Sequence, residues 1–366
     1  MLQLMPLLET LRIDLPIIQA PMAGVSSPAM AAAVSNAGAL GSIGVGASDA
    51  AGARKMIAAL RDRTQRSFNV NVFCHQPAKP DASLELAWLA RLRPHFDEHG
   101  AGTPERLRET YRSFLEDEAM LALLLTEKPP VVSFHFGVPP REAIRALRES
   151  GIVLMASATT VAEGRTAQQA GVHAVVAQGY EAGGHRGVFD PDAPDDCLGT
   201  MALTRLLVRE LDIPVVATGG IMDGAGIAAA LRLGAAAAQL GTAFIACPES
   251  EADAGFRAAL ASDAAHHTVM TRVISGRPAR CLSNRFTALG LEVQPQQVPS
   301  YPLAYDAGKA LNSAAKAANE TGYGAQWAGQ GAPLARSLPA AELVATLARE
   351  IEQAAPVRLD PTQARR

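Results

Sequence analysis

A single histidine lies in a glycine-rich segment of this 366-residue chain, where a strand is expected to end. The segment from Gln178 to Gly187 reads Gln-Gly-Tyr-Glu-Ala-Gly-Gly-His-Arg-Gly and directly follows the apolar run 174–177. Glycine lets a backbone approach a ligand and adopt positive φ, and an imidazole can exchange a proton near neutral pH. His185 is therefore a candidate catalytic residue. The alternative is a histidine that is only packed and hydrogen-bonded within the fold.

Two further segments have the composition of phosphate-binding loops. Residues 217–221 read Ala-Thr-Gly-Gly-Ile and residues 239–243 read Gln-Leu-Gly-Thr-Ala, and each lies at the end of an expected strand. Backbone N–H groups at such strand ends, followed by a helix N-terminus, commonly bind a phosphate. Neither segment has a lysine or the spacing of a nucleoside-triphosphate loop, which favours a monophosphate. The structural alternative is that these glycines only form tight turns.

Two other segments could contact a flat ring. Pro21-Met22-Ala23-Gly24 follows the first expected strand, and Asn71 ends the third, where its amide could bond to ring heteroatoms. Taken singly, both segments are also compatible with a purely structural role. Residues 41–46 contain three glycines but lack the order and the downstream acidic residue of a dinucleotide fold, so a Rossmann site is rejected.

Further polar side chains are expected at the same end of the fold. His135, in the Ser-Phe-His-Phe-Gly segment, ends the fourth expected strand. Tyr301, Tyr305 and Lys309 are spaced to share one face of a helix and could present two phenols and an ammonium to an anion. The alternative is an ordinary amphipathic helix with its lysine in water. No His, Asp and Glu cluster has metal-ligand spacing, so no metal is expected.

The elements that must position these residues follow a repeated pattern of an apolar strand, a glycine or small polar residue, and an alanine-rich helix. Continuously apolar strands separated by helices indicate a parallel sheet that is buried on both faces. Eight such units predict an α/β fold, a (β/α)8 TIM barrel, with its site at the carboxyl ends of the strands. The expected strands are 17–20, 39–43, 68–72, 131–134, 153–156, 174–177, 215–218 and 237–240.

Helices are expected at 27–37, 50–61, 141–150, 160–170 and 225–233, with a closing helix at 338–354. Two irregular regions interrupt the repeat and are expected to form a smaller, mainly helical cap over the site. The barrel is then assigned to 1–76, 129–250 and 333–355, the insertion and cap to 77–128 and 251–332, and a loose tail to 356–366.

Composition excludes several classes of function. The chain is 48% hydrophobic and 19% charged, which fits a globular protein, and its net charge of −3 gives no basic footprint for nucleic acid or an anionic membrane. No signal peptide or membrane-spanning run is evident, so a cytoplasmic protein is expected. A homodimer is expected only because dimers are common. The widely spaced cysteines are expected to be buried thiols: Cys74, Cys197, Cys247 and Cys281.

The segments quoted above, together with Asn69-Val70-Asn71, resemble in order those of the nitronate monooxygenases, formerly called 2-nitropropane dioxygenases. The resemblance covers nearly the whole chain and implies an FMN-containing TIM barrel with a smaller second domain. Its most specific part is Glu-Ala-Gly-Gly-His. The same superfamily also contains flavin-dependent enoyl-acyl carrier protein reductases and NADH:quinone reductases.

The resemblance also assigns roles to individual residues. It makes His185 the catalytic histidine. It places FMN among residues that follow the strands: Ala20, Pro21, Met22, Ala23, Asn71, Gln178, Gly183, Gly184, Gly219, Gly220, Gln239, Leu240, Gly241 and Thr242. It implies a substrate pocket like that of the bacterial class I enzymes, formed by His135, Tyr111, Tyr301, Tyr305 and Lys309. Phe256 stands where some relatives carry a phenol.

The reaction that the resemblance implies is the oxidation of an alkyl nitronate, such as propionate 3-nitronate, with O2 to an aldehyde or oxo acid and nitrite. Lys309, with His185 and His135 as donors, would hold the anion over the flavin. His185 would be the base if a neutral nitroalkane is accepted. The first alternative is an NAD(P)H-dependent flavin reductase, and the second is a non-catalytic barrel that binds a phosphate ligand.

Overall fold

The computed structural model describes residues 4–354, and all eight predicted strands form one parallel sheet. Its order is β1-β9-β8-β6-β5-β4-β3-β2, and a parallel bridge between Ile18 and Leu40 joins the two edge strands. The fold is therefore the predicted TIM barrel. The strands are β1 (Ile17–Gln19), β2 (Gly41–Gly44), β3 (Phe68–Phe73), β4 (Val131–His135), β5 (Val153–Ala158), β6 (Ala174–Gln178), β8 (Val215–Thr218) and β9 (Ala237–Leu240).

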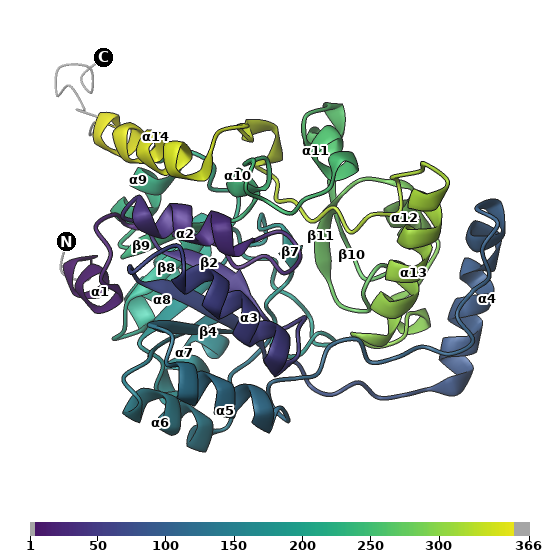
Figure 1. The fold of residues 1–366 in the computed structure, drawn as a ribbon, viewed down its shortest axis with the longest axis horizontal. Coiled ribbons are helices and arrows are strands. Elements are labelled where there is room, and N and C mark those ends of the chain that lie inside the picture. The colour runs from purple at the N-terminus through teal and green to yellow at the C-terminus, as the bar shows by residue number, and fades with distance from the viewer. Residues whose placement is uncertain (1–3, 355–366) are drawn as a thin grey trace, which may run out of the picture.

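Helices on the outside of the sheet alternate with the strands (Figure 1). Several begin at residues that cap the free N–H groups of the first turn, as Ser27 does for Met30 N and Asp49 for Gly52 N. The five predicted helices and the closing helix are present, whereas α8 was not predicted. The ring consists of α2 (Pro28–Asn36), α3 (Ala50–Arg61), α5 (Glu118–Glu127), α6 (Arg141–Glu149), α7 (Val161–Ala170), α8 (Thr200–Glu210), α9 (Gly224–Arg232) and α14 (Ala340–Gln353).

A short helix, α1 (Leu4–Leu11), covers the amino ends of the strands. Its Leu7 and Leu11 are buried in one cluster with strand residues that include Ile18, Met155 and Val216. Apolar packing thus closes this end of the barrel, which fits a site at the carboxyl ends of the strands.

The cap has its own core and lies beside the carboxyl ends of the strands (Figure 1). Trp88 and Phe96 of α4 pack there with Ile274, Phe286 and Leu311. Its helices are α4 (Ala82–Glu98), α11 (Ala254–Leu260), α12 (Arg285–Ala288) and α13 (Leu303–Ala317), with 3₁₀ turns η1 (Asp263–His266), η2 (Leu289–Leu291) and η3 (Pro295–Gln297). Two short elements adjoin the barrel loops: α10 (Thr242–Ile245) and η4 (Ala332–Leu334).

A three-stranded antiparallel sheet in this region was not predicted. It consists of β10 (Thr268–Thr271), β11 (Ala279–Leu282) and β7 (Gly184–His185). The insertion 77–128 contributes to both parts of the molecule, because α4 packs against α13 whereas α5 packs against α3 and α6. The domain boundaries stay a prediction, and the tail 356–366 lies outside the described residues.

Cys197 is exposed, contrary to the expectation of four buried thiols, while the other three cysteines are buried. It lies in the loop between β7 and α8, where its N–H donates to the carboxylate of Asp195. Among residues 4–354, no helix combines the length and hydropathy needed to cross a membrane. The same residues contain no group of three or more His, Cys, Asp or Glu side chains that could hold a metal ion.

Candidate active site

A cavity of about 470 Å³ lies between the carboxyl ends of the barrel strands and the cap. This volume is typical of a site for a cofactor or small ligand. Nearly every predicted site residue lines it. The exception is Leu240, which packs between the sheet and the outer helices because successive residues of a strand face opposite sides. The predicted residues at the cavity are Ala20, Pro21, Met22, Ala23, Asn71, Tyr111, His135, Gln178, Gly183, Gly184, His185, Gly219, Gly220, Gln239, Gly241, Thr242, Tyr301, Tyr305 and Lys309.

The Glu-Ala-Gly-Gly-His segment is held by contacts that explain its composition. The Glu181 carboxylate accepts hydrogen bonds from the N–H and the hydroxyl of Thr200, the first residue of α8. A Cβ on Gly183 would lie 2.4 Å from Gly329 N, so this position has no room for a side chain. Gly184 has φ +74°, which favours glycine. His185 is thereby delivered to the cavity on β7 rather than at the end of β6, where it was expected.

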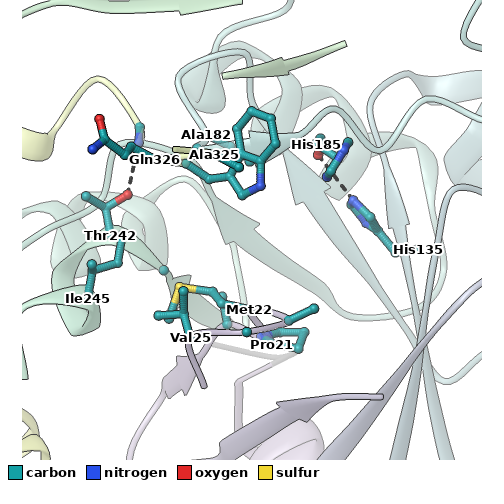
Figure 2. Close-up of a pocket in the computed structure, with 18 of the residues that line it drawn as sticks. Pro21, Met22, Val25, His135, Ala182, His185, Thr242, Ile245, Ala325 and Gln326 are labelled. Atoms are coloured by element: carbon teal, nitrogen blue, oxygen red, sulfur yellow. Dashed lines mark hydrogen bonds between the residues drawn. The ribbon is translucent and has the colours of Figure 1, made fainter. Parts of the chain in front are cut away.

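Two side chains fix the backbone of His185. Its carbonyl oxygen accepts a hydrogen bond from Gln178 Nε2 at 3.1 Å and lies 3.2 Å from His135 Nε2. Gln178 Oε1 also accepts from Gly187 N. The loop around His185 is therefore clamped on both sides, and Figure 2 shows the two imidazoles together at one end of the cavity.

Both ring nitrogens of His135 are engaged with protein atoms. Its Nδ1 lies 2.9 Å from Ser157 Oγ, and its Nε2 faces the carbonyl of His185. Since that carbonyl can only accept, His135 donates through Nε2 and accepts through Nδ1. His135 lines the cavity as expected, but it supports the His185 backbone and has no donor left for a ligand.

Burial keeps the histidines of this cluster uncharged at neutral pH. It lowers the pKa of His135 to about 4, and Arg277 and Arg186 act in the same direction. Burial also lowers the pKa of His185 well below its usual value, with His135, Arg277 and His75 adding to the effect. His185 can therefore accept a proton but does not bring a permanent positive charge.

The two predicted phosphate loops meet at the other end of the cavity, where Figure 2 shows Thr242. Gly219 and Gly220 have φ +123° and φ +69°, which turns the chain sharply after β8. The backbone N–H groups of Gly220 and Gly241 donate to no atom of the described residues. Thr242 Oγ1 accepts from Gly329 N at 2.9 Å, which ties the second loop to the segment 325–331.

The wall between the two ends is formed by the segment after β1 and by Asn71. Pro21 and Met22 lie along one side in Figure 2. Asn71 donates from Nδ2 to the carbonyl and the hydroxyl of Ser133, which leaves Oδ1 without a partner among residues 4–354. The side-chain amide of Gln239 likewise has no partner in the described chain and lines the cavity. These amides are available to the heteroatoms of a ligand.

The cap contributes the expected tyrosines and lysine. Lys309 Nζ lies 4.3 Å from the ring centre of Tyr111 and 5.3 Å from that of Tyr305. No described carboxylate forms a salt bridge with this ammonium, and burial lowers its pKa. Tyr301 precedes α13 instead of sharing its face, because the helix begins only at Leu303, but its ring still packs near Tyr111 and His185.

Four aromatic residues at the cavity were not predicted from the sequence: Phe73, Phe136, Tyr323 and Trp327. Trp327 lines the cavity, its ring centre lies 5.0 Å from that of His185, and its Nε1 donates to Tyr305 Oη at 3.3 Å. Phe136 has φ +73°, uncommon for a residue with a side chain, and its ring lies 4.3 Å from that of His135. Two sequence features could have pointed to Trp327 and Phe136: the chain has only two tryptophans, and Phe136 follows a predicted strand.

Comparison with known proteins identifies the family. The profile of the family described as Nitronate monooxygenase matches residues 5–350. A nitronate monooxygenase of Paraburkholderia phytofirmans is 62% identical over 95% of this chain and 95% of its own length. A nitronate monooxygenase of Pseudomonas aeruginosa is 55% identical over 93% of this chain and 97% of its own.

Solved structures agree with the sequence comparison. The nitroalkane oxidase from Streptomyces ansochromogenes superposes with a TM-score of 0.87 and 42% identity, covering 95% of this chain and 98% of its own. FabK from Thermotoga maritima has a TM-score of 0.71 and 29% identity over 95% of this chain and 96% of its own. The chain belongs to the nitronate monooxygenase family and is an oxidoreductase.

Proposed function

We propose that this protein is an FMN-dependent nitronate monooxygenase. It oxidises alkyl nitronates, such as propionate 3-nitronate, with O2 to an aldehyde or oxo acid and nitrite. The observation that carries the proposal is one cavity in which, among the described residues, backbone amides are free at one end, while at the other an ammonium without a salt bridge and an uncharged histidine both lie near the Tyr305 ring. Such a cavity suits a phosphate-bearing cofactor together with an anionic substrate.

The residues present fit FMN. The amides of Gly220 and Gly241 and the side chain of Thr242 would hold its phosphate, while Asn71 and Gln239 would bond to its ring. A Cβ on Gly241 would lie 3.5 Å from Ala20 and 3.6 Å from Met22, so a side chain there would fill this end of the cavity. When bound, FMN supplies the electron acceptor for the nitronate and the site of reaction with O2.

The side chains of the cap supply substrate recognition. Lys309 is half-buried, lies among tyrosine rings, and has no salt bridge with any residue from 4 to 354. An anionic nitronate would provide the missing counter-charge in a site that excludes most water. Burial raises the pKa of Tyr301 well above its usual value and that of Tyr305 to about 12, so both phenols stay protonated and can donate.

His185 acts as a proton acceptor in this proposal. Because its imidazole is uncharged, it would take the α-proton from a neutral nitroalkane rather than attract an anion by charge. With a substrate that is already a nitronate, its role is to orient the reacting carbon next to the ring of the cofactor. We also propose, from the sequence, that the protein is cytoplasmic and forms a homodimer.

A nitrite assay tests the proposed reaction. The purified protein is expected to be yellow and to release nitrite from propionate 3-nitronate in air. Variants His185→Asn and Lys309→Met are expected to lose most of kcat/KM. Failure to release nitrite by a flavin-loaded protein would contradict the proposal, and unchanged kcat/KM in both variants would show that the site lies elsewhere.

The similarity to FabK supports a second candidate, an NAD(P)H-dependent flavin reductase. Anaerobic mixing separates the two functions. A monooxygenase is expected to bleach its flavin with nitronate and not with NADH, whereas rapid bleaching by NADH would favour the reductase. A protein that binds flavin and does neither would be the non-catalytic barrel.

A further inference from the structure

The hairpin between β10 and β11 brings a serine and an arginine to the catalytic histidine. Strand β11 pairs with β7, and Ala279 lies opposite His185 in this ladder. The turn before it contains Ser275, whose Oγ lies 2.9 Å from His185 Nε2. Gly276 has φ +90°, and a Cβ there would lie 2.4 Å from Pro299 O. The turn is thus fixed against the cap segment that leads to Tyr301.

The hydrogen bonds of Ser275 bear on which nitrogen of His185 carries the proton. The Ser275 hydroxyl lies 3.2 Å from the carbonyl oxygen of Arg277, which can only accept, and its oxygen accepts from Arg277 N at 3.4 Å. With the hydroxyl proton given to that carbonyl, the Ser275 oxygen accepts from His185, which places the His185 proton on Nε2. Nδ1 then has the lone pair, and it has no hydrogen-bond partner in the described part of the chain.

Arg277 places a buried positive charge behind the same histidine. The side chain is 2% exposed and forms no ion pair with any residue between 4 and 354. Its Nη2 donates to the carbonyl of Val188, while Nε has no partner there. Removing a guanidinium from water without a carboxylate is costly, so a purely structural role is a poor explanation.

Phe136 connects this charge to the histidines. The guanidinium carbon of Arg277 lies 4.2 Å from the centre of the Phe136 ring. The ring centre of His135 lies 4.3 Å from that of Phe136, and the ring centre of His185 lies 5.7 Å from it, edge-on at 88°. A cation on an aromatic face is stabilised by the ring, and that ring also fixes the plane of His185.

We propose that Ser275 and Arg277 are positioning residues for the reaction. The serine hydroxyl fixes the His185 tautomer with its proton on Nε2, and the guanidinium, packed on Phe136 next to the histidines, adds to the effect of burial in keeping the imidazole uncharged. Nδ1 is left as the proton acceptor. The inference rests on the proposed role of His185 in the oxidation of nitro compounds. The titratable groups that face His185 from the elements packed around it are His75, His135, Arg277, Tyr301 and Tyr305.

The tautomer can be read directly from imidazole nitrogen chemical shifts of the purified enzyme labelled in its histidines. The His185 signals are assigned by their loss in His185→Asn. The wild-type enzyme is expected to show a neutral ring protonated on Nε2 from about pH 5.5 to about pH 9. Ser275→Ala is expected to lose this single tautomer, and Ser275→Thr, which keeps the hydroxyl, to retain it. A wild-type proton on Nδ1 would overturn the inference.

The charge effect is tested by titration of the same signals. In Arg277→Met, loss of the cation is expected to move the titration of His185 upward into the measured range. Arg277→Lys keeps the charge, so its His185 titration is expected to stay close to that of the wild type. Arg272→Met is the matched control, since Arg272 precedes the same turn but pairs with exposed Asp192. A His185 titration in Arg277→Met identical to that of the control would contradict the role of Arg277.

Activity gives a second measurement. Both Ser275→Ala and Arg277→Met are expected to lower kcat/KM roughly 10- to 100-fold, as for residues that orient a functional histidine. In Arg277→Met the loss is expected to be largest at low pH, whereas a merely structural defect would lower the profile uniformly. If the wild-type enzyme released no nitrite, the proposed function would fail, but the chemical shifts would still decide the tautomer.

Discussion

The polar side chains around the cavity differ in whether the protein already satisfies their hydrogen bonds. Gln178 uses its side-chain donor and acceptor on the loop that carries His185, and His135 donates to the same loop and accepts from Ser157. Gln239 and Lys309 form no such bonds within residues 4–354. Unsatisfied buried polar groups are costly, so the second group is the one expected to bind ligands.

Lys309 provides the clearest test at the scale of one residue. Replacement by Met should raise KM for an anionic nitronate about 10- to 100-fold, because a charge-assisted contact contributes about 1.5–3 kcal/mol. Steady-state kinetics would measure this, with a smaller change expected in kcat. Lys316→Met is the control, because Lys316 lies on the same helix and pairs with Asp253 at 2.6 Å. Equal KM in both variants would exclude Lys309 from substrate binding.

At the scale of elements, the segment 325–331 connects the cap to the barrel loops. Gly329 N donates to Thr242, Gln330 N donates to the carbonyl of Glu181, and Trp327 lies against His185. One stretch of chain without a strand or an α-helix therefore contacts both ends of the cavity. Its position depends on the absence of side chains where it crosses the Glu-Ala-Gly-Gly-His loop.

Gly183→Ala should displace this segment. The added Cβ would lie 2.5 Å from the carbonyl carbon of Ala328, which forces backbone to move, and overpacking of this kind costs about 1–3 kcal/mol. We expect a lower thermal unfolding temperature and weaker flavin retention, measured by calorimetry and by visible absorbance of the purified protein. Gly102→Ala should change neither, since a Cβ there meets nothing within 4 Å. A stable, fully yellow Gly183→Ala variant would refute the packing argument.

The barrel strands could be predicted because they are buried, largely apolar runs separated by helical stretches. Strands β7, β10 and β11 could not, since they are short and joined by pairing between distant parts of the chain, as between Arg280 and Gly184. His185 was found because glycines surround it. Trp327 was missed because its role depends on tertiary packing that no local pattern encodes.

At the scale of the whole molecule, the uncharged histidines make stability depend on pH. Burial lowers the pKa of His75 and His135 to about 4, and that of His185 is also lowered. Their folded pKa values lie below the unfolded value of about 6.5, so the unfolded chain binds more protons in between. Their full contribution to stability is present above about pH 6.5 and is lost as the pH falls toward 4.

The unfolding free energy should therefore decrease by up to about 1.4 kcal/mol per pH unit for each of these histidines between about pH 6 and pH 4. Urea denaturation at a series of pH values would measure the slope. His75→Phe should remove one of the three contributions without altering a residue that lines the cavity. A stability that is constant over this range would mean that these rings are already charged in the folded protein.

The contact of α14 with α2 and α9 also has a consequence for biosynthesis. Helix α2 is synthesised before the other helices of the ring and α14 after them, so the ring of helices cannot close until α14 has left the ribosome. Until then, the apolar faces of α2 and α9 and the adjoining strand residues are exposed in the nascent chain. Such surfaces favour aggregation, and we expect translation stalled before residue 340 to leave a chain that depends on chaperones.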